Sequence, residues 1–167
     1  MNKPDKKPDY RIEIDISRQQ LALFENDRQV KTFAVSTAAN GPGEQQHSEC
    51  TPRGRHEIAE KIGADCAVNT IFVGRRPTGE IYSLAMREQH PDRDWILTRI
   101  LWLAGCEPGV NCGGDVDSHD RYIYIHGTPD DVELDKPGSR GCVRMRNADI
   151  LELFDRVPVN TPVLIQA

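Results

Sequence analysis

The sequence predicts a mainly β fold, a β-rich α+β domain with one helix near its C-terminus. Several short segments alternate apolar and polar side chains and are separated by turn residues, which is typical of strands with one buried face. Only one segment has the apolar spacing of an amphipathic helix. With 167 residues the chain is long enough to bury a core. We expect a flexible segment at residues 1–9 and a single domain at residues 10–167.

The first part of the domain reads as three strands in close succession. Alternating apolar residues predict a strand at residues 10–16. Residues 20–24 and 29–36 predict the next two strands, joined by a hairpin turn around residues 25–27.

Turn residues divide the middle of the chain. A Thr-Pro-Arg-Gly turn at residues 51–54 precedes a predicted strand at residues 56–62. Further along, residues 70–73 and 80–85 are expected to flank a turn at residues 77–79.

The last third of the chain contains the predicted helix between two strands. Residues 121–125, rich in Tyr and Ile, predict the first of these strands, and residues 161–166 predict the second. The helix is expected to have Asn147 as its N-cap and to stop before Pro158. Its apolar stripe consists of Ile150, Leu151, Phe154 and Val157.

Two long segments show no clear periodicity. Residues 87–94 are rich in charge, and residues 105–120 contain four glycines. Loops of this length in a compact domain often carry function. Because the second loop runs directly into the strand at residues 121–125, we expect it to form a wall of an active site. The first loop reads equally well as a solvated connection.

Composition excludes several classes of partner. A formal net charge of −5 and a pI near 5.5 argue against a nucleic-acid binder. The longest apolar segment, residues 95–105, contains an Arg and is too short to cross a bilayer, so no membrane contact is expected. No signal peptide is visible. We expect a cytoplasmic location if Met1 is the native start, and a periplasmic one if a leader precedes it.

The chain contains five cysteines. An odd number leaves at least one thiol free, which suits a reducing compartment and a thiol enzyme. Cys106 and Cys112 could pair, or join His119 in a metal site, but their C-x5-C spacing matches none of the common zinc patterns. We therefore expect no metal and no cofactor.

Residues 122–145 carry the most distinctive chemistry. His126 ends the predicted strand, where its side chain can meet solvent, and Cys142 follows 16 positions later in a glycine turn. A thiol nucleophile needs a base, and imidazole is the usual one. Gly138 and Gly141 allow the turn an unusual φ, so the N–H groups of Gly141 and Cys142 can converge on one point as an oxyanion hole.

A structural histidine and a small buried thiol are the alternatives for His126 and Cys142. Three arginines close to the cysteine in sequence, Arg140, Arg144 and Arg146, argue against them. Positive charge lowers the pKa of a thiol and can also hold an anionic substrate. The pattern therefore favours a reactive cysteine.

These residues resemble a known family. The H-G-T of residues 126–128 and the S-x-G-C-V-R-M of residues 139–145 are similar to the L,D-transpeptidase (YkuD) catalytic domain, as is the T-P-x-G of residues 51–54. The resemblance covers residues 10–166 and fixes residue types, order and spacing together. The chain departs from it at Arg140, where many members carry His, so a role for a second histidine is absent.

The resemblance implies a β-sandwich with one helix in the C-terminal region and long active-site loops. It also implies cysteine-dependent acyl transfer on peptidoglycan stem peptides. Cys142 would attack the carbonyl at the L-centre of the third residue and release the terminal D-alanine. His126 would activate the thiol and protonate the leaving amine. Backbone carbonyls near Ser139 would orient the imidazole, and the N–H of Gly141 would help stabilise the oxyanion.

The resemblance further implies what binds at the site. Arg144, Arg140 and Gly127 are the implied substrate-binding residues, and the ligands are stem peptides or soluble muropeptides. Carbapenem-type β-lactams could form an adduct on Cys142.

The acyl acceptor decides the activity. Because no leader is visible, we expect water as acceptor, which makes the protein an L,D-carboxypeptidase of muropeptide recycling. An amine acceptor would instead give an L,D-transpeptidase that forms 3–3 cross-links or exchanges D-amino acids. A non-catalytic muropeptide sensor is the alternative of another class. A papain-like protease is disfavoured because His126 precedes Cys142 in the chain.

Overall fold

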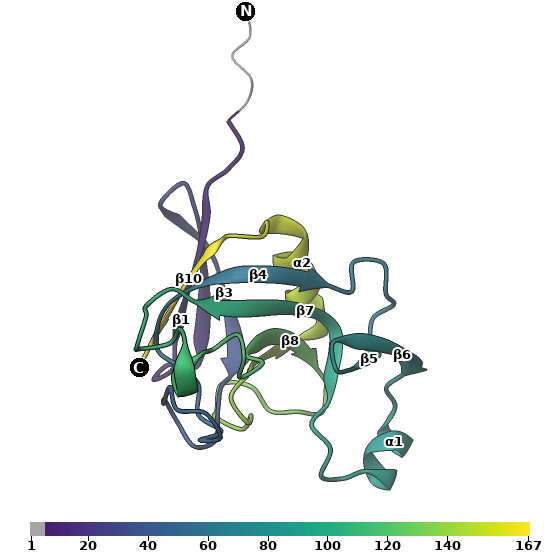
Figure 1. Cartoon of the computed structure of the whole chain (residues 1–167). Helices are drawn as coiled ribbons and strands as arrows, with labels where there is room; N and C mark the ends of the chain where they lie inside the picture. Colours follow the sequence, from purple (N-terminus) through teal and green to yellow (C-terminus); the bar gives the residue numbers. More distant parts are fainter. Residues whose placement is uncertain (1–5) are drawn as a thin grey trace, which may run out of the picture.

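The computed structural model describes residues 6–167, and its ten strands form one sheet that folds over on itself (Figure 1). The strand order is β4-β10-β1-β2-β3-β9-β8-β7-β5-β6, and an additional pairing of β4 with β7 closes the strands from β4 to β7 in this order into a ring, with β5 and β6 outside it. The predicted mainly β fold is confirmed. The strands are β1 Tyr10–Asp15, β2 Gln20–Glu25, β3 Arg28–Ser36, β4 Gly54–Ile62, β5 Thr70–Val73, β6 Arg76–Ile81, β7 Ile96–Gly105, β8 Tyr124–Thr128, β9 Val143–Arg146 and β10 Pro162–Gln166.

The N-terminal hairpin forms where the sequence predicts it. Strands β1 and β2 pair antiparallel, as do β2 and β3. Asn26 and Asp27 join β2 to β3 and have φ of 50° and 64°. After glycine, Asn and Asp are the residues that best tolerate this left-handed conformation. Of the segment expected to be flexible, residues 1–5 lie outside the described residues, and residues 6–9 have no regular secondary structure.

The prediction for residues 70–85 is wrong in two respects. The turn between β5 and β6 lies at Gly74 and Arg75, with φ of 55° and 65°, rather than at residues 77–79. Pro77 lies within β6, the edge strand of the sheet, where proline is tolerated. The expected strand at residues 80–85 is present only at residues 80–81, where β6 ends, and residues 84–85 belong to α1 (Leu84–Gln89), whose residues are strong helix formers.

Two further strands differ from the sequence prediction. The strand predicted at residues 121–125 begins only at Tyr124, because Tyr122 adopts a left-handed φ of 57°. β7, for which no element was predicted, pairs with β4, β5 and β8. Most of its side chains are buried, which explains a run of apolar residues without alternation.

Helix α2 (Asn147–Arg156) lies close to β7, β8 and β9, as in Figure 1. Its position is as predicted, but Arg146 occupies the N-cap, and the side chain of Asn147 bonds to Thr98 and Asn69 instead. Tertiary hydrogen bonds have taken the place of the expected local cap. The buried stripe contains Leu153 in place of Leu151 and consists of Ile150, Leu153, Phe154 and Val157.

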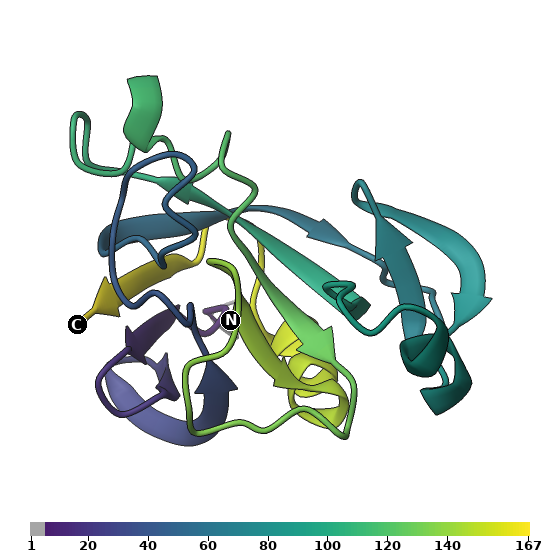
Figure 2. The same cartoon turned by 90° about the horizontal axis from the view of Figure 1, so that it is seen from below.

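The core fills the space enclosed by the closed sheet and α2. It combines side chains from both ends of the chain, such as Ile14, Ile125 and Ile165. Strands β5 and β6 and helix α1 extend to one side of this body, on the right in Figure 2. Among the described residues, no helix is long and apolar enough to span a membrane.

Gly54, in the Thr-Pro-Arg-Gly turn, should tolerate substitution poorly. Its φ is +96°, and an added Cβ would meet the carboxylate of Glu107 and lie 2.9 Å from Asn111 Nδ2. We expect Gly54→Ala to lower the free energy of unfolding by about 2–5 kcal/mol, since left-handed strain and overpacking add. Gly74→Ala is the matched control, because Gly74 has φ +55° but open space around it, so strain alone costs about 1–2 kcal/mol. Equal losses in urea denaturation would contradict the close packing at Gly54.

Candidate active site

The parallel pairing of β8 with β9 brings the two predicted reactive residues together. In its register Ile125 lies opposite Val143, and His126 lies opposite Arg144. Ile125 and Val143 belong to the main core, so His126 and Cys142 point to the other face of the sheet. Segments 16 positions apart in sequence thus become neighbours on one face.

The Cys142 thiol is held by the backbone just before and at the start of β8. Its Sγ donates to the carbonyl of Tyr122 and accepts the N–H of Tyr124, both at 3.3 Å. The residue is half-buried and packs beside Phe72, Ile100 and Tyr124. These contacts fix the direction in which the sulfur points.

The imidazole of His126 is fully buried, with 0% of the residue exposed. The prediction that His126 meets solvent at a strand end is wrong, because β8 continues to Thr128. Its Nδ1 lies 2.6 Å from the carbonyl oxygen of Gly127. A carbonyl can only accept, so Nδ1 carries the proton, and Nε2, which has no partner among the described residues, is left as a base.

Ser139 supports the cysteine turn and does not orient the imidazole. Its hydroxyl donates to the Cys142 carbonyl at 2.5 Å and accepts the Gly141 N–H at 3.2 Å. Its own carbonyl is taken by the N–H of Ala39 at 2.9 Å. The expectation that carbonyls near Ser139 hold His126 is therefore corrected: the carbonyl of Gly127 does so.

The same contacts restrict the expected oxyanion hole. The N–H of Gly141 is engaged with Ser139, whereas no hydrogen bond within residues 6–167 uses the N–H of Cys142. Gly141 has φ 132°, a conformation that favours glycine. An added Cβ there would come within 3.2 Å of the Cys50 carbonyl.

Thr51, the first residue of the Thr-Pro-Arg-Gly turn, fixes the cysteine turn by a hydrogen bond to it. Its fully buried hydroxyl donates to the Gly141 carbonyl at 2.9 Å and accepts the N–H of Ala38 at 2.9 Å. This explains physically why the motif of residues 51–54 accompanies the cysteine motif.

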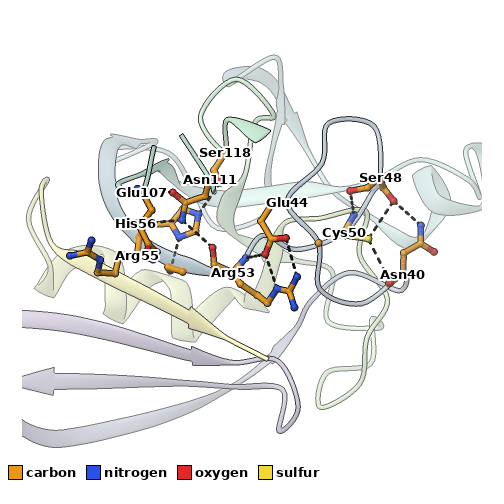
Figure 3. A network of polar contacts seen from close by, with 12 residues as sticks. Asn40, Glu44, Ser48, Cys50, Arg53, Arg55, His56, Glu107, Asn111 and Ser118 are labelled. Atoms are coloured by element: carbon orange, nitrogen blue, oxygen red, sulfur yellow. Dashed lines mark hydrogen bonds and ion pairs between the residues drawn. The ribbon is translucent and has the colours of Figure 1, made fainter. Parts of the chain in front are cut away.

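The loop at residues 105–120 is anchored on β4, as Figure 3 shows. Glu107 accepts the Arg55 N–H at 2.8 Å, and Asn111 donates to the carbonyls of Arg53 and Arg55 at 3.0 Å. Ser118 bonds the buried ring of His56 at 2.8 Å. These residues have a scaffolding role.

The pocket at Cys142, about 440 Å³ in volume, is not walled by the loop at residues 105–120, contrary to the prediction. One wall comes from residues 121–124, and another from the turn between β5 and β6. In that turn, the guanidinium of Arg75 lies 4.7 Å from the ring centroids of both Trp102 and Tyr122, and it donates to the Tyr124 hydroxyl at 3.1 Å. His119 stacks on the same Trp102 at 3.9 Å.

The arginines expected around Cys142 separate in the structure. Arg140 lines the pocket and donates to the Asp92 carbonyl at 2.7 Å. Arg144 pairs with Asp94 at 2.9 Å and has only 15% of its side chain exposed. Arg146 instead bonds the Asp130 carbonyl, and it does not line the pocket. Gly127, expected to bind substrate, is buried and acts on His126 through its carbonyl.

The sequence missed three charged residues that line this pocket. Asp94, Arg75 and Arg121 come from segments that carry no motif. The negative charge of Asp94 acts to raise the pKa of both His126 and Cys142, and at His126 it opposes the larger lowering by burial. Only the charged character of the loop before β7 could have indicated it.

The electrostatics of the thiol differ from the expectation. Burial raises the pKa of Cys142 to about 12, because the effect of removing the sulfur from water exceeds the lowering by the Tyr124 N–H, Arg144 and Arg121. Burial likewise lowers the pKa of His126, against the opposing effect of Asp94 and the Gly127 carbonyl. The resting pair is therefore a neutral thiol and a neutral imidazole.

The arrangement suits nucleophilic chemistry with a coupled proton transfer. All five cysteines are free thiols. Within residues 6–167, no three His, Cys, Asp or Glu side chains are grouped as for a metal ion. The site instead offers a thiol, an oriented base and an adjacent pocket, the parts needed to attack a carbonyl carbon.

Comparison with known proteins supports the resemblance seen in the sequence. The family model of the L,D-transpeptidase catalytic domain (YkuD) matches residues 9–165. A relative from Bacillus licheniformis that carries the name L,D-transpeptidase YkuD is 29% identical over 163 residues, which cover 97% of this chain and 68% of the relative.

Solved structures show the likeness of the fold. L,D-transpeptidase 3 of Mycobacterium tuberculosis, in complex with a faropenem-derived adduct, superposes with a TM-score of 0.59 at 15% identity, over 96% of this chain and 61% of that one. The L,D-transpeptidase LdtMt1, in complex with imipenem, gives 0.56 at 15% identity, over 95% and 59%. The chain thus spans about three fifths of these structural neighbours.

The raised thiol pKa predicts the pH dependence of alkylation. Because iodoacetamide reacts with the thiolate, the labelling rate of Cys142 in the folded protein should still rise at about pH 10. The same cysteine in denaturant should reach half of its maximal labelling rate near its ordinary pKa of about 8.5 and level off above about pH 10. Peptide mapping by mass spectrometry separates it from the other four cysteines. A plateau below about pH 8 in the folded protein would contradict the neutral thiol.

Proposed function

The chain belongs to the L,D-transpeptidase catalytic domain (YkuD) family, and from that premise we propose cysteine-dependent acyl transfer on peptidoglycan stem peptides. One observation carries the proposal: a buried imidazole, with Nδ1 on a carbonyl and Nε2 unpaired among the described residues, lies on the same sheet face as a pocket-lining thiol. A residue with only a structural role would use both ring nitrogens.

The first half-reaction makes a thioester. Cys142 Sγ attacks the carbonyl at the L-centre of the third stem residue while its proton passes to His126 Nε2. The tetrahedral oxyanion accepts a hydrogen bond from the backbone N–H of Cys142. When the intermediate collapses, the bond to the terminal D-alanine breaks, and the imidazolium returns the proton to the leaving amine.

The pKa values decide the timing of this proton transfer. Since burial disfavours both the thiolate and the imidazolium, an ion pair does not form before substrate arrives. The proton moves as the sulfur attacks. Asp94 then supports the transient imidazolium, because its charge raises the pKa of His126.

The charges around the pocket support an anionic substrate. Arg75, Arg121 and Arg140 line it together with one acidic residue, Asp94, which is paired with Arg144. None of the three lining arginines forms a salt bridge with a carboxylate of residues 6–167, although Arg121 donates to backbone carbonyls. This concentration of positive charge contrasts with a net charge of −5 for the chain. Stem peptides carry several carboxylates, which such guanidinium groups recognise well.

The second half-reaction has two candidate acceptors. Water, the acceptor expected from the sequence, releases a tripeptide and defines an L,D-carboxypeptidase. An amine of another stem peptide gives a 3–3 cross-link and defines an L,D-transpeptidase. A second hollow of about 220 Å³ supports the amine as an alternative, because it adjoins the pocket at Cys142 and shares with it Arg121, Tyr122, Ile123 and Arg140.

Turnover of a disaccharide tetrapeptide tests the proposal. The wild type should release D-alanine, and Cys142→Ala and His126→Ala should lose at least about 1,000-fold in kcat/KM while remaining folded by circular dichroism. Cys106→Ala, which removes an exposed thiol outside the pocket, is the matched control and should retain full activity.

The products separate the alternatives. Free tripeptide identifies the carboxypeptidase, and cross-linked dimer without tripeptide identifies the transpeptidase. Binding of the muropeptide without release of D-alanine by the wild type would favour the sensor. Release of D-alanine by Cys142→Ala would contradict the assigned nucleophile.

A carbapenem should acylate Cys142, as the imipenem and faropenem complexes of the structural neighbours suggest. We expect one equivalent of imipenem adduct in the intact mass of the wild type, mapped to Cys142, because opening of the β-lactam ring is an acyl transfer to the same thiol. Cys106→Ala should be labelled equally. Labelling of Cys142→Ala to the same extent would refute this prediction.

A further inference from the structure

Thr98 has a strained backbone and lies against Gly127, the residue that follows His126. It is fully buried within β7 and has φ 75°, a left-handed value that is very unusual for a β-branched residue. It lies at an irregularity of β7, where the pairing with β8 shifts between Leu97 and Ile100. Leu97, the residue before it, pairs with Gly127.

The Thr98 hydroxyl belongs to a closed set of hydrogen bonds. It donates to Asn147 Oδ1 at 2.6 Å and accepts the backbone N–H of Asn69 at 3.1 Å. The Asn147 amide in turn donates to Asn69 Oδ1 at 2.8 Å. We call Thr98, Asn69 and Asn147 the amide–hydroxyl cluster. It joins β7, the start of α2 and the residue that precedes β5.

The amide–hydroxyl cluster packs closely against Gly127. An added Cβ at Gly127 would lie 2.5 Å from Asn147 Oδ1, 2.6 Å from the Leu97 carbonyl and 3.0 Å from Thr98 Cβ. The Gly127 backbone therefore has almost no room to move on this side. Its carbonyl is the group that accepts from His126 Nδ1 at 2.6 Å.

We propose that Thr98 and Asn147 are positioning residues, which hold the Gly127 carbonyl in place and thereby fix the tautomer and orientation of the His126 ring. The inference rests on the proposed function of His126 as the base. A strained backbone persists only where its surroundings over-determine it, and such strain concentrates at functional sites. Helix α2 does not require Asn147, since the Asn147 side chain caps no helix end.

The test uses the full chain with ¹⁵N-labelled histidine. In the wild type, the ring nitrogens of His126 should show one tautomer, protonated at Nδ1. Thr98→Gly accepts the left-handed φ but removes the hydroxyl, and Asn147→Ala removes the amide. Both should give a mixture of tautomers and lower kcat roughly 10- to 100-fold, with KM changed by less than about 3-fold, since a misplaced base affects the chemical step.

Two variants make the comparison specific. Thr98→Ser keeps the hydroxyl and should restore the single tautomer and most of kcat. Thr161→Ala removes another buried threonine hydroxyl, which bonds the Pro158 carbonyl away from the site, and should change neither readout. If Thr98→Gly does not fold, Asn147→Ser replaces it in the same comparison.

The tautomer readout needs no substrate, so it distinguishes two failures. A wild type without turnover would refute the proposed function, while the tautomer comparison would still decide whether the amide–hydroxyl cluster positions the ring. An unchanged Nδ1 tautomer with unchanged kcat in folded Thr98→Gly and Asn147→Ala would overturn the inference.

Discussion

The site depends on the parallel pairing of β8 with β9. That register places Ile125 and Val143 in the core and, on the opposite face, His126 and Cys142. Other parts of the fold support this pair: Thr51 holds the carbonyl of the cysteine turn, and the loop at residues 105–120 holds the strand that follows Thr51. A shift of one residue in the register would exchange the reactive face for the core face.

Burial shifts the pKa values of Cys142 and His126 more than the neighbouring charges do. The arginines near Cys142 lower its thiol pKa only in part, and burial holds it at about 12. The imidazole is buried as well, and its Nδ1 proton is fixed by the Gly127 carbonyl. Arg75 and Arg140 line the pocket, while Arg144 is paired with Asp94, and this arrangement fits the anionic substrate that we propose.

Much of the fold, and the expectation that His126 and Cys142 lie near each other, follow from the sequence, because both leave local signals. Alternation predicts β1, β2 and β3, and the spacing of His126 and Cys142 within a family motif indicates their pairing. Features that depend on distant contacts do not follow. Asn147 reads as a helix cap but bonds to Thr98 and Asn69, and Asp94 and Arg75 reach the pocket from segments without a motif, since only the folded sheet brings them there.

In the proposed mechanism a neutral Cys142 thiol attacks the stem peptide with His126 as its base. Trapping the acyl-enzyme tests it most directly: the wild type is mixed with a disaccharide tetrapeptide, quenched in acid within milliseconds to seconds, and measured as intact protein. We expect a mass increase equal to the tripeptide acyl group, mapped to Cys142 and absent from His126→Ala. Release of D-alanine with no such adduct, or with an adduct on another residue, would contradict it.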